Sequence, residues 1–486
     1  METLDWLVIG IFFLALIGII VWVVKQKQND SADYFLGGRD ATWLAIGASI
    51  FASNIGSEHL IGLAGAGASS GMAMAHWEIQ GWMILILGWV FVPFYSRSMV
   101  FTMPEFLERR YNPQSRTILS VISLISYVLT KVAVTVYAGG LVFQQVFGIK
   151  ELWGIDFFWI AAIGLVILTA LYTIFGGMKS VLYTSILQTP ILLLGSLIIL
   201  VLGFKELGGW DEMMRICGAA TVNDYGNTMT ELIRSNNDPN FPWLGALIGS
   251  AIIGFWYWCT DQFIVQRVLS GKNEKEARRG TIFGAYLKLL PVFLFLIPGM
   301  IAFALHQKYL GTGGEGFLPM LANGNANADA AFPTLVAKLL PAGVKGLVVC
   351  GILAALMSSL ASLFNSSAML FTIDFYKRFK PNTSEKKLVG IGQMATVAIV
   401  ILGILWIPIM RSVGDVLYTY LQDVQSVLAP GIAAAFLLGI CWKRTSAQGG
   451  MWGLIAGMII GLTRLGAKVY YSNVGDVSSS TFKYLF

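Results

Sequence analysis

The stretch Phe51-Ala-Ser-Asn-Ile-Gly-Ser-Glu-His-Leu-Ile-Gly-Leu-Ala-Gly-Ala-Gly67 decides how the rest of the chain is interpreted. Its flanks are hydrophobic enough to cross a membrane, but its middle carries a glycine, polar side chains and the carboxylate of Glu58. A charge inside a membrane span is costly and usually faces a cavity or a pathway. Backbone leaves the helix at membrane depth only where it is buried in protein or lines a cavity. Residues 54–58 are therefore predicted to be an unwound segment at a binding site. The alternative is a kinked packing segment, because small residues also let membrane helices approach closely.

The amino-acid composition indicates a protein that crosses a membrane many times. Of its 486 residues, 56% are hydrophobic and 12% are charged, whereas about a quarter of the residues of a soluble domain are charged. The four cysteines are far apart in the sequence, which indicates neither a disulfide framework nor a metal cluster. The sequence contains no nucleophile–base set or cofactor motif, so an enzyme is not expected.

About twelve membrane helices are expected. The first, Trp6 to Val24, carries no charge and is long enough to span a bilayer. The other predicted spans are 42–70, 74–96, 118–147, 157–175, 181–204, 242–265, 280–305, 332–373, 388–409, 413–439 and 447–466. Because 332–373 is too long for one span, a re-entrant or surface piece is expected before Gly346.

Basic residues orient these helices. If the N-terminus lies outside, most of the 33 lysines and arginines fall in inside loops, and the acidic loop 205–241 falls outside. This distribution follows the positive-inside rule. We therefore expect a multi-pass protein of the cell membrane, plasma or inner, with its N-terminus outside. The net charge of +6 is then a topology signal and does not indicate a nucleic-acid partner.

A second interrupted span indicates an internal repeat. The small-residue stretch Gly245-Ala-Leu-Ile-Gly-Ser-Ala-Ile-Ile-Gly254 precedes Phe255-Trp-Tyr-Trp-Cys-Thr-Asp-Gln262. Interrupted helices at corresponding positions of two halves point to the binding site of a transporter. These are the second and seventh spans, which predicts a five-plus-five inverted repeat. The expected division is an N-terminal helix and cytoplasmic linker (1–41), a first repeat (42–204), an extracellular loop (205–241), a second repeat (242–439), and a C-terminal helix and tail (440–486).

One predicted span carries a polar stripe that suits a cation. Ala355, Ser358, Ser359, Ser362 and Ser366 recur at helical spacing and share one face. Serine hydroxyls can join helices, and their oxygens can also bind a hard cation such as Na⁺. The stripe alone favours helix contacts. Together with unwound carbonyls in the first interrupted span, it favours a sodium site.

Other spans carry polar groups that suit an uncharged solute. Tyr418, Gln422 and Gln425 share one face, and amides and phenols can both donate hydrogen bonds to hydroxyl groups and accept them. Lys131 and Lys288 lie within spans, where a lysine needs a partner or water. A functional role is favoured for Lys288, whereas structural pairing suits Lys131 equally well.

The chain resembles the sodium/glucose cotransporters of the sodium:solute symporter family along nearly its whole length. The motifs that carry the resemblance are Gly47-Ala-Ser49 with Ala52-Ser-Asn-Ile-Gly-Ser57, Thr102-Met-Pro-Glu-Phe106, Phe175-Gly-Gly-Met-Lys-Ser180, Trp256-Tyr-Trp-Cys-Thr-Asp-Gln-Phe-Ile-Val-Gln-Arg267, Tyr286-Leu-Lys-Leu289, Ser358-Ser-Leu-Ala-Ser-Leu-Phe-Asn-Ser366, and Leu428-Ala-Pro-Gly-Ile-Ala433 with Trp442-Lys-Arg444. The resemblance implies an all-α polytopic membrane protein with a leucine-transporter-type five-plus-five inverted repeat and extra N- and C-terminal helices.

The resemblance implies a sodium site where the first interrupted helix meets the serine stripe. The implied ligands are the carbonyls of Ala52, Ile55 and Ala355 and the hydroxyls of Ser358 and Ser359. Na⁺ would be the bound ion. Ser185 stands where many relatives have an aspartate associated with sodium coupling, which leaves the number of sodium ions open.

The resemblance also implies a sugar site with two gates. The sugar-contacting residues would be Asn54, His59, Glu78, Trp258, Lys288 and Gln422. Tyr257 would stack beneath the sugar as the inner gate, and the outer hydrophobic gate would consist of Leu63, Trp77 and Tyr418. Judged by its position alone, Glu78 suits the membrane interface equally well. Gly81 and Gly254 stand where some relatives have sugar-contacting side chains, so the particular sugar is left open.

The expected function is Na⁺-coupled symport of a monosaccharide of the glucose or galactose type by alternating access. Its partners would be the sugar, the sodium ion and the lipid bilayer. The nearest alternative is the same machinery carrying myo-inositol, another polyol or an amino acid. A passive channel or a transporter-derived sensor is the alternative from another class. Relatives usually have one or two more spans, so a further helix beyond Phe486 is expected.

Overall fold

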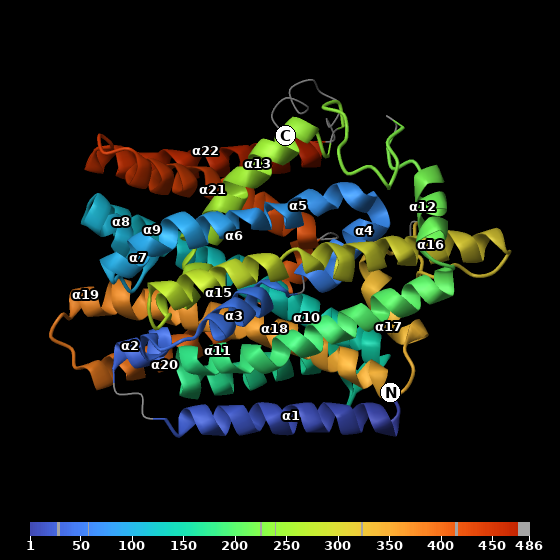
Figure 1. The fold of residues 1–486 in the computed structure, drawn as a ribbon, viewed down its shortest axis with the longest axis horizontal. Coiled ribbons are helices and arrows are strands. Elements are labelled where there is room, and N and C mark those ends of the chain that lie inside the picture. The colour runs from blue at the N-terminus through green and yellow to red at the C-terminus, as the bar shows by residue number, and fades with distance from the viewer. Residues whose placement is uncertain are drawn as a thin grey trace.

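The computed structural model describes the chain except residues 27–29, 57, 224–225, 239, 322–323, 414–416 and 475–486, and except the side chains of 129, 145, 409–424 and 468–474. The described chain is almost entirely helical. One short antiparallel hairpin pairs β1 (Glu151–Leu152) with β2 (Ile155–Asp156). The long helices lie roughly side by side in one bundle (Figure 1).

The first half of the chain runs through its helices in the following order, with η marking 3-10 or π-helical segments. They are α1 (Thr3–Val24), α2 (Ser31–Leu36), η1 (Gly37–Arg39), α3 (Trp43–Asn54), η2 (Glu58–Leu63), α4 (Ala64–Ser70), η3 (Gly71–Ala75), α5 (His76–Ile79), η4 (Gln80–Trp82), α6 (Met83–Ile86), η5 (Leu87–Phe91), α7 (Val92–Ser98), α8 (Met103–Arg110), α9 (Pro113–Ser126), η6 (Tyr127–Val132), α10 (Ala133–Phe147) and α11 (Phe157–Leu207).

The second half continues in the same way. Its helices are α12 (Trp210–Ala219), α13 (Trp243–Gly254), η7 (Phe255–Thr260), α14 (Gln262–Leu269), α15 (Glu274–Leu287), η8 (Val292–Leu296), α16 (Ile297–Gly311), η9 (Ala328–Ala330), α17 (Ala331–Leu339), α18 (Val344–Met369), η10 (Leu370–Tyr376), α19 (Lys377–Phe379), α20 (Glu385–Val413), α21 (Leu417–Cys441) and α22 (Ala447–Val474).

The helices agree with the predicted spans. Among the described residues, nine helical stretches are long and apolar enough to cross a membrane. Phe157–Leu207 contains two predicted spans, and Glu58–Ser98 contains the span 74–96 together with the second part of 42–70. In α11 the division falls at Gly177, whose φ of 52° lies in the left-handed region that glycine tolerates. A separate piece does precede Gly346 within the predicted span 332–373. It is the short helix α17, which ends at Leu339 before α18 begins at Val344.

The core of the bundle is built around α18. This helix is buried along most of its length, whereas α1 and α22 are largely exposed at the periphery and lie along opposite edges of the bundle (Figure 1). The long α11 and the short α3 both pack against α18. Because α3 stops at Asn54, the end of an interrupted helix lies beside the most buried helix of the protein.

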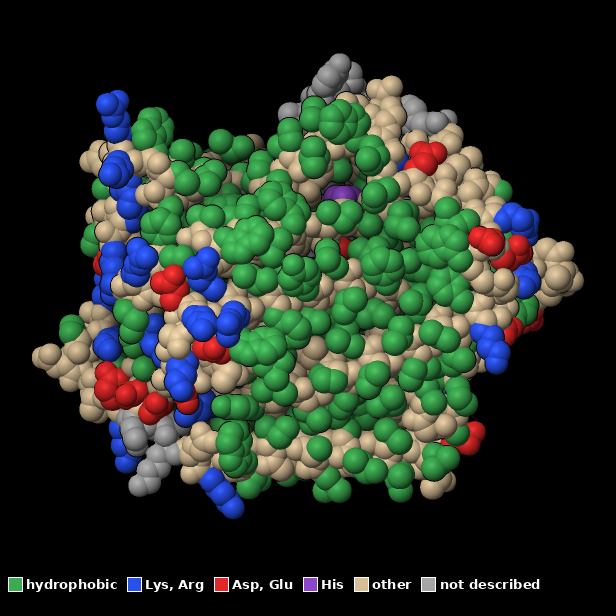
Figure 2. Space-filling view, viewed as in Figure 1, with side chains coloured by type: hydrophobic (Ala, Val, Ile, Leu, Met, Phe, Trp, Pro, Cys, Tyr) green, Lys and Arg blue, Asp and Glu red, His purple; other side chains and the backbone are tan. Residues whose placement is uncertain are grey.

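The surface divides into a hydrophobic band and charged ends. Figure 2 shows apolar side chains covering the middle of one face, and Lys and Arg gathered at the end where α2, α8 and α19 lie. A band of this kind fits the hydrocarbon core of a bilayer.

Candidate functional site

The first interruption lies where the sequence predicts an unwound segment. Helix α3 ends at Asn54, and Ile55 is extended with φ −79° and ψ 104°. Helical structure resumes at Glu58 in η2. The segment is therefore a break in the helix, and the alternative of a merely kinked packing segment is wrong. The break leaves main-chain carbonyls of α3 without intrahelical partners and so available to other groups.

The second interruption lies further along the chain than the sequence predicts. The glycine-rich residues 245–254 remain helical in α13, and the break falls at Asp261, which is extended between η7 and α14. The Asp261 carboxylate accepts a hydrogen bond from the main-chain N–H of Phe263 and so caps the new helix. Gly254 instead permits close packing, since a Cβ there would lie 2.8 Å from Oε1 of Gln80.

The two interrupted helices and their neighbours enclose a central cavity. It is lined by Asn54, Glu58, His59, Trp77, Glu78, Gln80, Ile253, Tyr257, Trp258, Lys288 and Gln425. These include every predicted solute residue whose side chain is described. Gln422 and Tyr418 lie outside the described side chains. The cavity volume is about 50 Å³, which is room for one or two water molecules.

Some predictions need correction or extension at this cavity. Leu63 is fully buried and does not line the cavity, whereas its predicted gate partner Trp77 does. Gln80 and Ile253 line it but were not predicted as site residues, because each lies in an apolar span with no pattern that distinguishes it. Glu58, which the sequence presents as the conspicuous charge of the first break, also lines the cavity.

Three charged or polar side chains meet at one wall of the cavity. Nζ of Lys288 lies 2.6 Å from Oε2 of Glu78 and 2.8 Å from Nε2 of His59, and that nitrogen lies 3.2 Å from Oε1 of Glu78. Each of the three side chains therefore lies within hydrogen-bond distance of the other two. The stem of Lys288 passes close to Gly81, where a Cβ would lie 2.6 Å from its Cγ. Glu78 is therefore buried at the cavity and paired there, rather than exposed at the end of a helix.

Several polar atoms around the cavity lack partners. Among the described residues, Oδ1 of Asn54, Nδ1 of His59 and Oε1 of Gln80 are buried and accept or donate no hydrogen bond. Nδ2 of Asn54 is engaged, because it donates to the hydroxyl of Tyr257 at 3.0 Å. Buried polar groups are normally satisfied, so these atoms are free to bind water or a polar ligand in the cavity.

A buried ion pair holds the second break against the fourth predicted span, 118–147. Nζ of Lys131 lies 2.6 Å from Oδ2 of Asp261, and the hydroxyl of Tyr127 donates to the other carboxylate oxygen. The ammonium also lies 4.7 Å from the ring centre of Tyr257 and 4.9 Å from that of Phe263. Lys131 therefore has the pairing partner that a lysine within a span requires.

The serine stripe of α18 contacts the first break directly. The hydroxyl of Ser359 donates to the carbonyl of Ser53 at 2.8 Å and to that of Ile55 at 3.4 Å. The hydroxyls of Ser53 and Ser362 lie 2.7 Å apart, and those of Ser185 and Ser358 lie 3.4 Å apart. The structure thus brings Ile55 and Ser359 of the predicted sodium ligands together. It adds Ser53, whose hydroxyl the sequence does not distinguish from other small residues.

The remaining predicted sodium ligands lie on the same helices. Ala52 is buried two residues before the end of α3. On α18, Ala355 is buried one turn before Ser359, and Ser358 is buried next to Ser359. Carbonyl and hydroxyl oxygens without a carboxylate form a donor set that suits a monovalent hard cation. Among the described residues, no group of three or more His, Cys, Asp or Glu side chains is arranged to hold a metal ion.

The loop after α12 is fastened to the far end of the first interrupted helix. Arg234 donates to the carbonyl of Ser70 at the end of α4 and pairs with Asp238 at 3.5 Å. Burial by itself raises the pKa of Asp238, but hydrogen bonds from the main chain of Phe241 and Asn240 and the charge of Arg234 hold it below its ordinary value. The depressed pKa stabilises the folded loop above the ordinary carboxyl pKa, and this stabilisation is lost only as the pH falls through the lowered value.

An all-helical membrane bundle with two interrupted helices around a small polar cavity defines a multi-pass transporter. A model described as "Sodium:solute symporter family" matches residues 34–457. The chain is 39% identical over 479 residues to "Sodium/myo-inositol cotransporter 2" of Homo sapiens, covering 96% of this chain and 70% of that protein. It is 38% identical over 486 residues to "Sodium/glucose cotransporter 4" of Mus musculus, covering 97% and 70%. The chain belongs to the sodium:solute symporter family.

Solved structures support the same fold. The chain is similar to a Na⁺-coupled sialic acid symporter in a substrate-bound outward-open state, with a TM-score of 0.77, 22% identity, and coverage of 95% of this chain and 98% of that one. It is also similar to MhsT in complex with L-phenylalanine, with a TM-score of 0.54, 12% identity, and coverage of 90% and 99%. The predicted leucine-transporter-type fold is confirmed. The protein is a transporter for Na⁺ and a solute and not an enzyme, and Na⁺ is a transported ion rather than a cofactor.

Proposed function

We propose that the transported solute is a neutral, hydroxylated six-carbon ring, a monosaccharide of the glucose or galactose type. The observation that carries the proposal is the mixture of donors and acceptors around the cavity, including the unpartnered atoms of Asn54, His59 and Gln80. Hydroxyl groups of a sugar both donate and accept and would satisfy all three. Gln422 and Tyr418 complete the proposed site as predictions from the sequence.

A cyclic polyol is the second candidate solute. Several similar proteins are named sodium/myo-inositol cotransporters, at 37–40% identity. Myo-inositol also presents hydroxyl groups around a six-membered ring, so the same unpartnered atoms would serve it. Among the described residues, Arg267 is buried but does not line the cavity, which gives an amino-acid carboxylate no guanidinium there.

The cavity must change shape to admit either solute. A volume of about 50 Å³ is smaller than a six-membered ring with its hydroxyl groups. We infer that Tyr257 acts as the inner gate and Trp77 contributes to the outer gate, because both line the cavity from different helices. Alternating movement of these elements would open the cavity to one side at a time.

We infer that sodium binds between the first break and α18. The Ser359 hydroxyl lies beside the carbonyls of Ser53 and Ile55, so an ion there would link the two helices through oxygens that already face one another. By fixing the first break, the ion would preorganise Asn54 and His59 for the solute. The coupling must be reciprocal, so the solute must also raise the affinity for Na⁺. An inward-negative potential contributes about 2.3 kcal/mol per charge per 100 mV.

The test of this function is uptake of a labelled sugar and polyol panel into proteoliposomes, with and without an inward Na⁺ gradient. Concentrative uptake of glucose or galactose is expected, and it should disappear when choline replaces Na⁺. Preferential uptake of myo-inositol would favour the second candidate. Uptake that never exceeds equilibration would instead indicate a passive channel or a sensor.

Ser359→Ala should weaken the dependence on Na⁺ more than it alters the choice of solute. The hydroxyl supplies one oxygen of the proposed ion site, and its loss should raise the Na⁺ concentration for half-maximal uptake by about tenfold, the cost of one hydrogen bond or ligand to a charged group. The measurement is uptake against Na⁺ concentration. Ser366→Ala, a change to the same stripe further from the break, serves as the control and should leave the Na⁺ dependence unchanged.

We propose that the N-terminus lies outside and the basic end of the molecule lies in the cytoplasm. The clustering of Lys and Arg in Figure 2 supports this orientation. Cys441 is exposed at the end of α21, and the other three cysteines are buried. A membrane-impermeant maleimide should therefore label Cys441 only from the cytoplasmic side. Labelling of Cys441 in intact cells would indicate the opposite orientation. The Cys441→Ser variant measures the background labelling of the other residues.

A further inference from the structure

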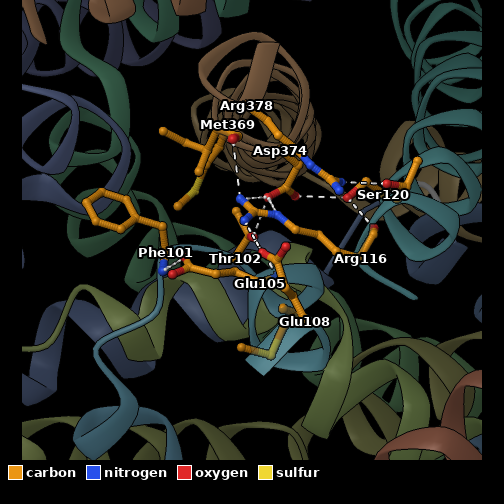
Figure 3. A network of polar contacts seen from close by, with 12 residues as sticks. Phe101, Thr102, Glu105, Glu108, Arg116, Ser120, Met369, Asp374 and Arg378 are labelled. Atoms are coloured by element: carbon orange, nitrogen blue, oxygen red, sulfur yellow. Dashed lines mark hydrogen bonds and ion pairs between the residues drawn. The ribbon is translucent and has the colours of Figure 1, made fainter. Parts of the chain in front are cut away.

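A second buried polar cluster lies at the basic end of the molecule, away from the cavity (Figure 3). The Asp374 carboxylate accepts hydrogen bonds from the hydroxyls of Thr102 at 2.8 Å and Ser120 at 3.0 Å, and from two nitrogens of Arg116 at 2.8 and 2.6 Å. Arg116 also pairs with Glu108 at 2.6 Å. The side chain of Asp374 is fully buried. A buried carboxylate with four donors, two of them charged, is held firmly.

This cluster joins three separate parts of the chain. Asp374 lies in η10, which continues the central helix α18, and Arg116 and Ser120 belong to α9. Thr102 is the N-cap of α8 and accepts from the main-chain N–H of Glu105 at 3.1 Å. The start of α8 is therefore fixed to both α9 and α18, and Figure 3 shows the side chains from these parts converging on Asp374.

The fixed segment also contacts the inner half of the second interrupted helix. The main-chain N–H of Met103 donates to Oε1 of Gln262 at 2.8 Å. Nε2 of Gln262 donates to the carbonyl of Phe101 and approaches the sulfur of Met369, each at 3.4 Å. Gln262 is the first residue of α14, directly after the break at Asp261. One neutral amide thus ties the start of this half-helix to the anchored segment.

A void of about 10 Å³ lies between this contact and the break, lined by Ser126, Tyr127, Trp256, Asp261 and Gln262 among others. It is at the lower limit of the space that one water needs. Tyr257 lines the central cavity and Gln262 lines this void, and the two cavities share no lining residue.

We propose that Asp374 and Gln262 are the two ends of a cytoplasmic latch. Asp374 is a positioning residue that fixes the start of α8, and Gln262 is the contact that breaks when the inner half of the second interrupted helix moves to release solute. The hydrogen bonds of the Asp374 carboxylate include two from a charged guanidinium, so they are stronger than those of the neutral Gln262 amide. We therefore expect the Gln262 contacts to break first and the Asp374 contacts to persist. The inference rests on the proposed symport, since it assigns one step of that cycle.

The latch can be tested by measuring access to the closed void. Ser126→Cys places a reporter there, and Cys441→Ser removes the exposed native thiol. In inside-out vesicles without Na⁺ or solute, Gln262→Ala should raise the rate of alkylation by a membrane-impermeant maleimide about fivefold, the equilibrium factor of one lost hydrogen bond. Asp374→Asn should raise it as well. Thr102→Val serves the same purpose if Asp374→Asn does not fold.

Gln393→Ala is the matched control. The Gln393 amide donates to the carbonyl of Ile174 at 3.1 Å and joins two helices without touching the α8 segment, so its loss should leave alkylation unchanged. The latch is refuted by an unchanged rate in Gln262→Ala, or by an equal increase in Gln393→Ala. Because the assay contains no solute, a failure to find a transported sugar would overturn the proposed function without altering this result.

Discussion

Replacing Glu78 by alanine should reduce Na⁺-driven uptake by a factor of about one hundred or more. The Lys288 ammonium would lose the carboxylate that lies 2.6 Å away, and both side chains are almost fully buried. Removing one partner of a buried pair costs about 3–5 kcal/mol. His59 would remain at 2.8 Å from Lys288, but an imidazole carries no negative charge and cannot balance the ammonium. Initial uptake rates in proteoliposomes, over a range of solute concentrations, measure the effect.

Two further variants separate solute binding from folding. Glu78→Ala combined with Lys288→Met removes both charges, so it should restore the yield of folded protein without restoring uptake. Glu212→Ala makes the same chemical change in the exposed pair with Arg215 and should leave uptake unchanged, because surface pairs contribute little. An unaltered solute affinity in folded Glu78→Ala would remove this residue from the site.

The second large effect is expected for Asp261→Ala. The substitution removes the partner of Lys131 at 2.6 Å and also the cap that accepts from the N–H of Phe263. The expected loss is about 3–5 kcal/mol for the unpaired charge and about 1 kcal/mol for the cap. The variant should be inactive and should unfold at a lower temperature. Thermal unfolding in detergent, together with uptake by the surviving folded protein, measures both consequences.

A double-mutant cycle isolates the ion pair from the cap. Asp261→Asn retains an oxygen that can cap the helix, and Lys131→Met retains most of the side-chain volume. The two substitutions should be far from additive in the free energy of unfolding, because the double variant leaves no unpaired charge. The exposed pair of Lys272 and Asp40, 4.0 Å apart, provides the control cycle and should show additivity. Additive effects at Lys131 and Asp261 would show that the pair does not hold the break.

The sequence predicts the site well where chemistry alone singles out a residue. A carboxylate or a lysine in an apolar span is conspicuous, and Glu78 and Lys288 indeed lie together at the cavity. Gln80 and Ile253 are not conspicuous, because nothing in the sequence states which side of a helix faces the cavity. Leu63 was predicted to line the outer gate, but it is fully buried and does not line the cavity. An apolar side chain near a break can pack against other helices, and the sequence does not distinguish the two cases.

The position of the second break shows why local pattern is insufficient. Glycine raises the entropic cost of a helix, so the sequence points to residues 245–254, yet these stay helical in α13, and only Gly254 at its end packs closely against Gln80 and Met83. The break occurs at Asp261 because Lys131 and Tyr127, from a distant span, hold its carboxylate. A long-range contact decides between two locally plausible sites.

The stretch from Phe51 to Gly67 predicted an interruption in the second span, because its polar middle is costly inside a membrane, but by itself it left a kinked packing segment equally open. The lengths of the apolar stretches predicted the approximate bounds of the spans, because a helix must be long enough to cross the hydrocarbon core of a bilayer. Only the tertiary structure decided what the interruption contacts: Ser359 from the central helix at its carbonyls, and Tyr257 at Asn54. Those partners lie hundreds of residues away, and helix packing rather than local sequence brings them to the break.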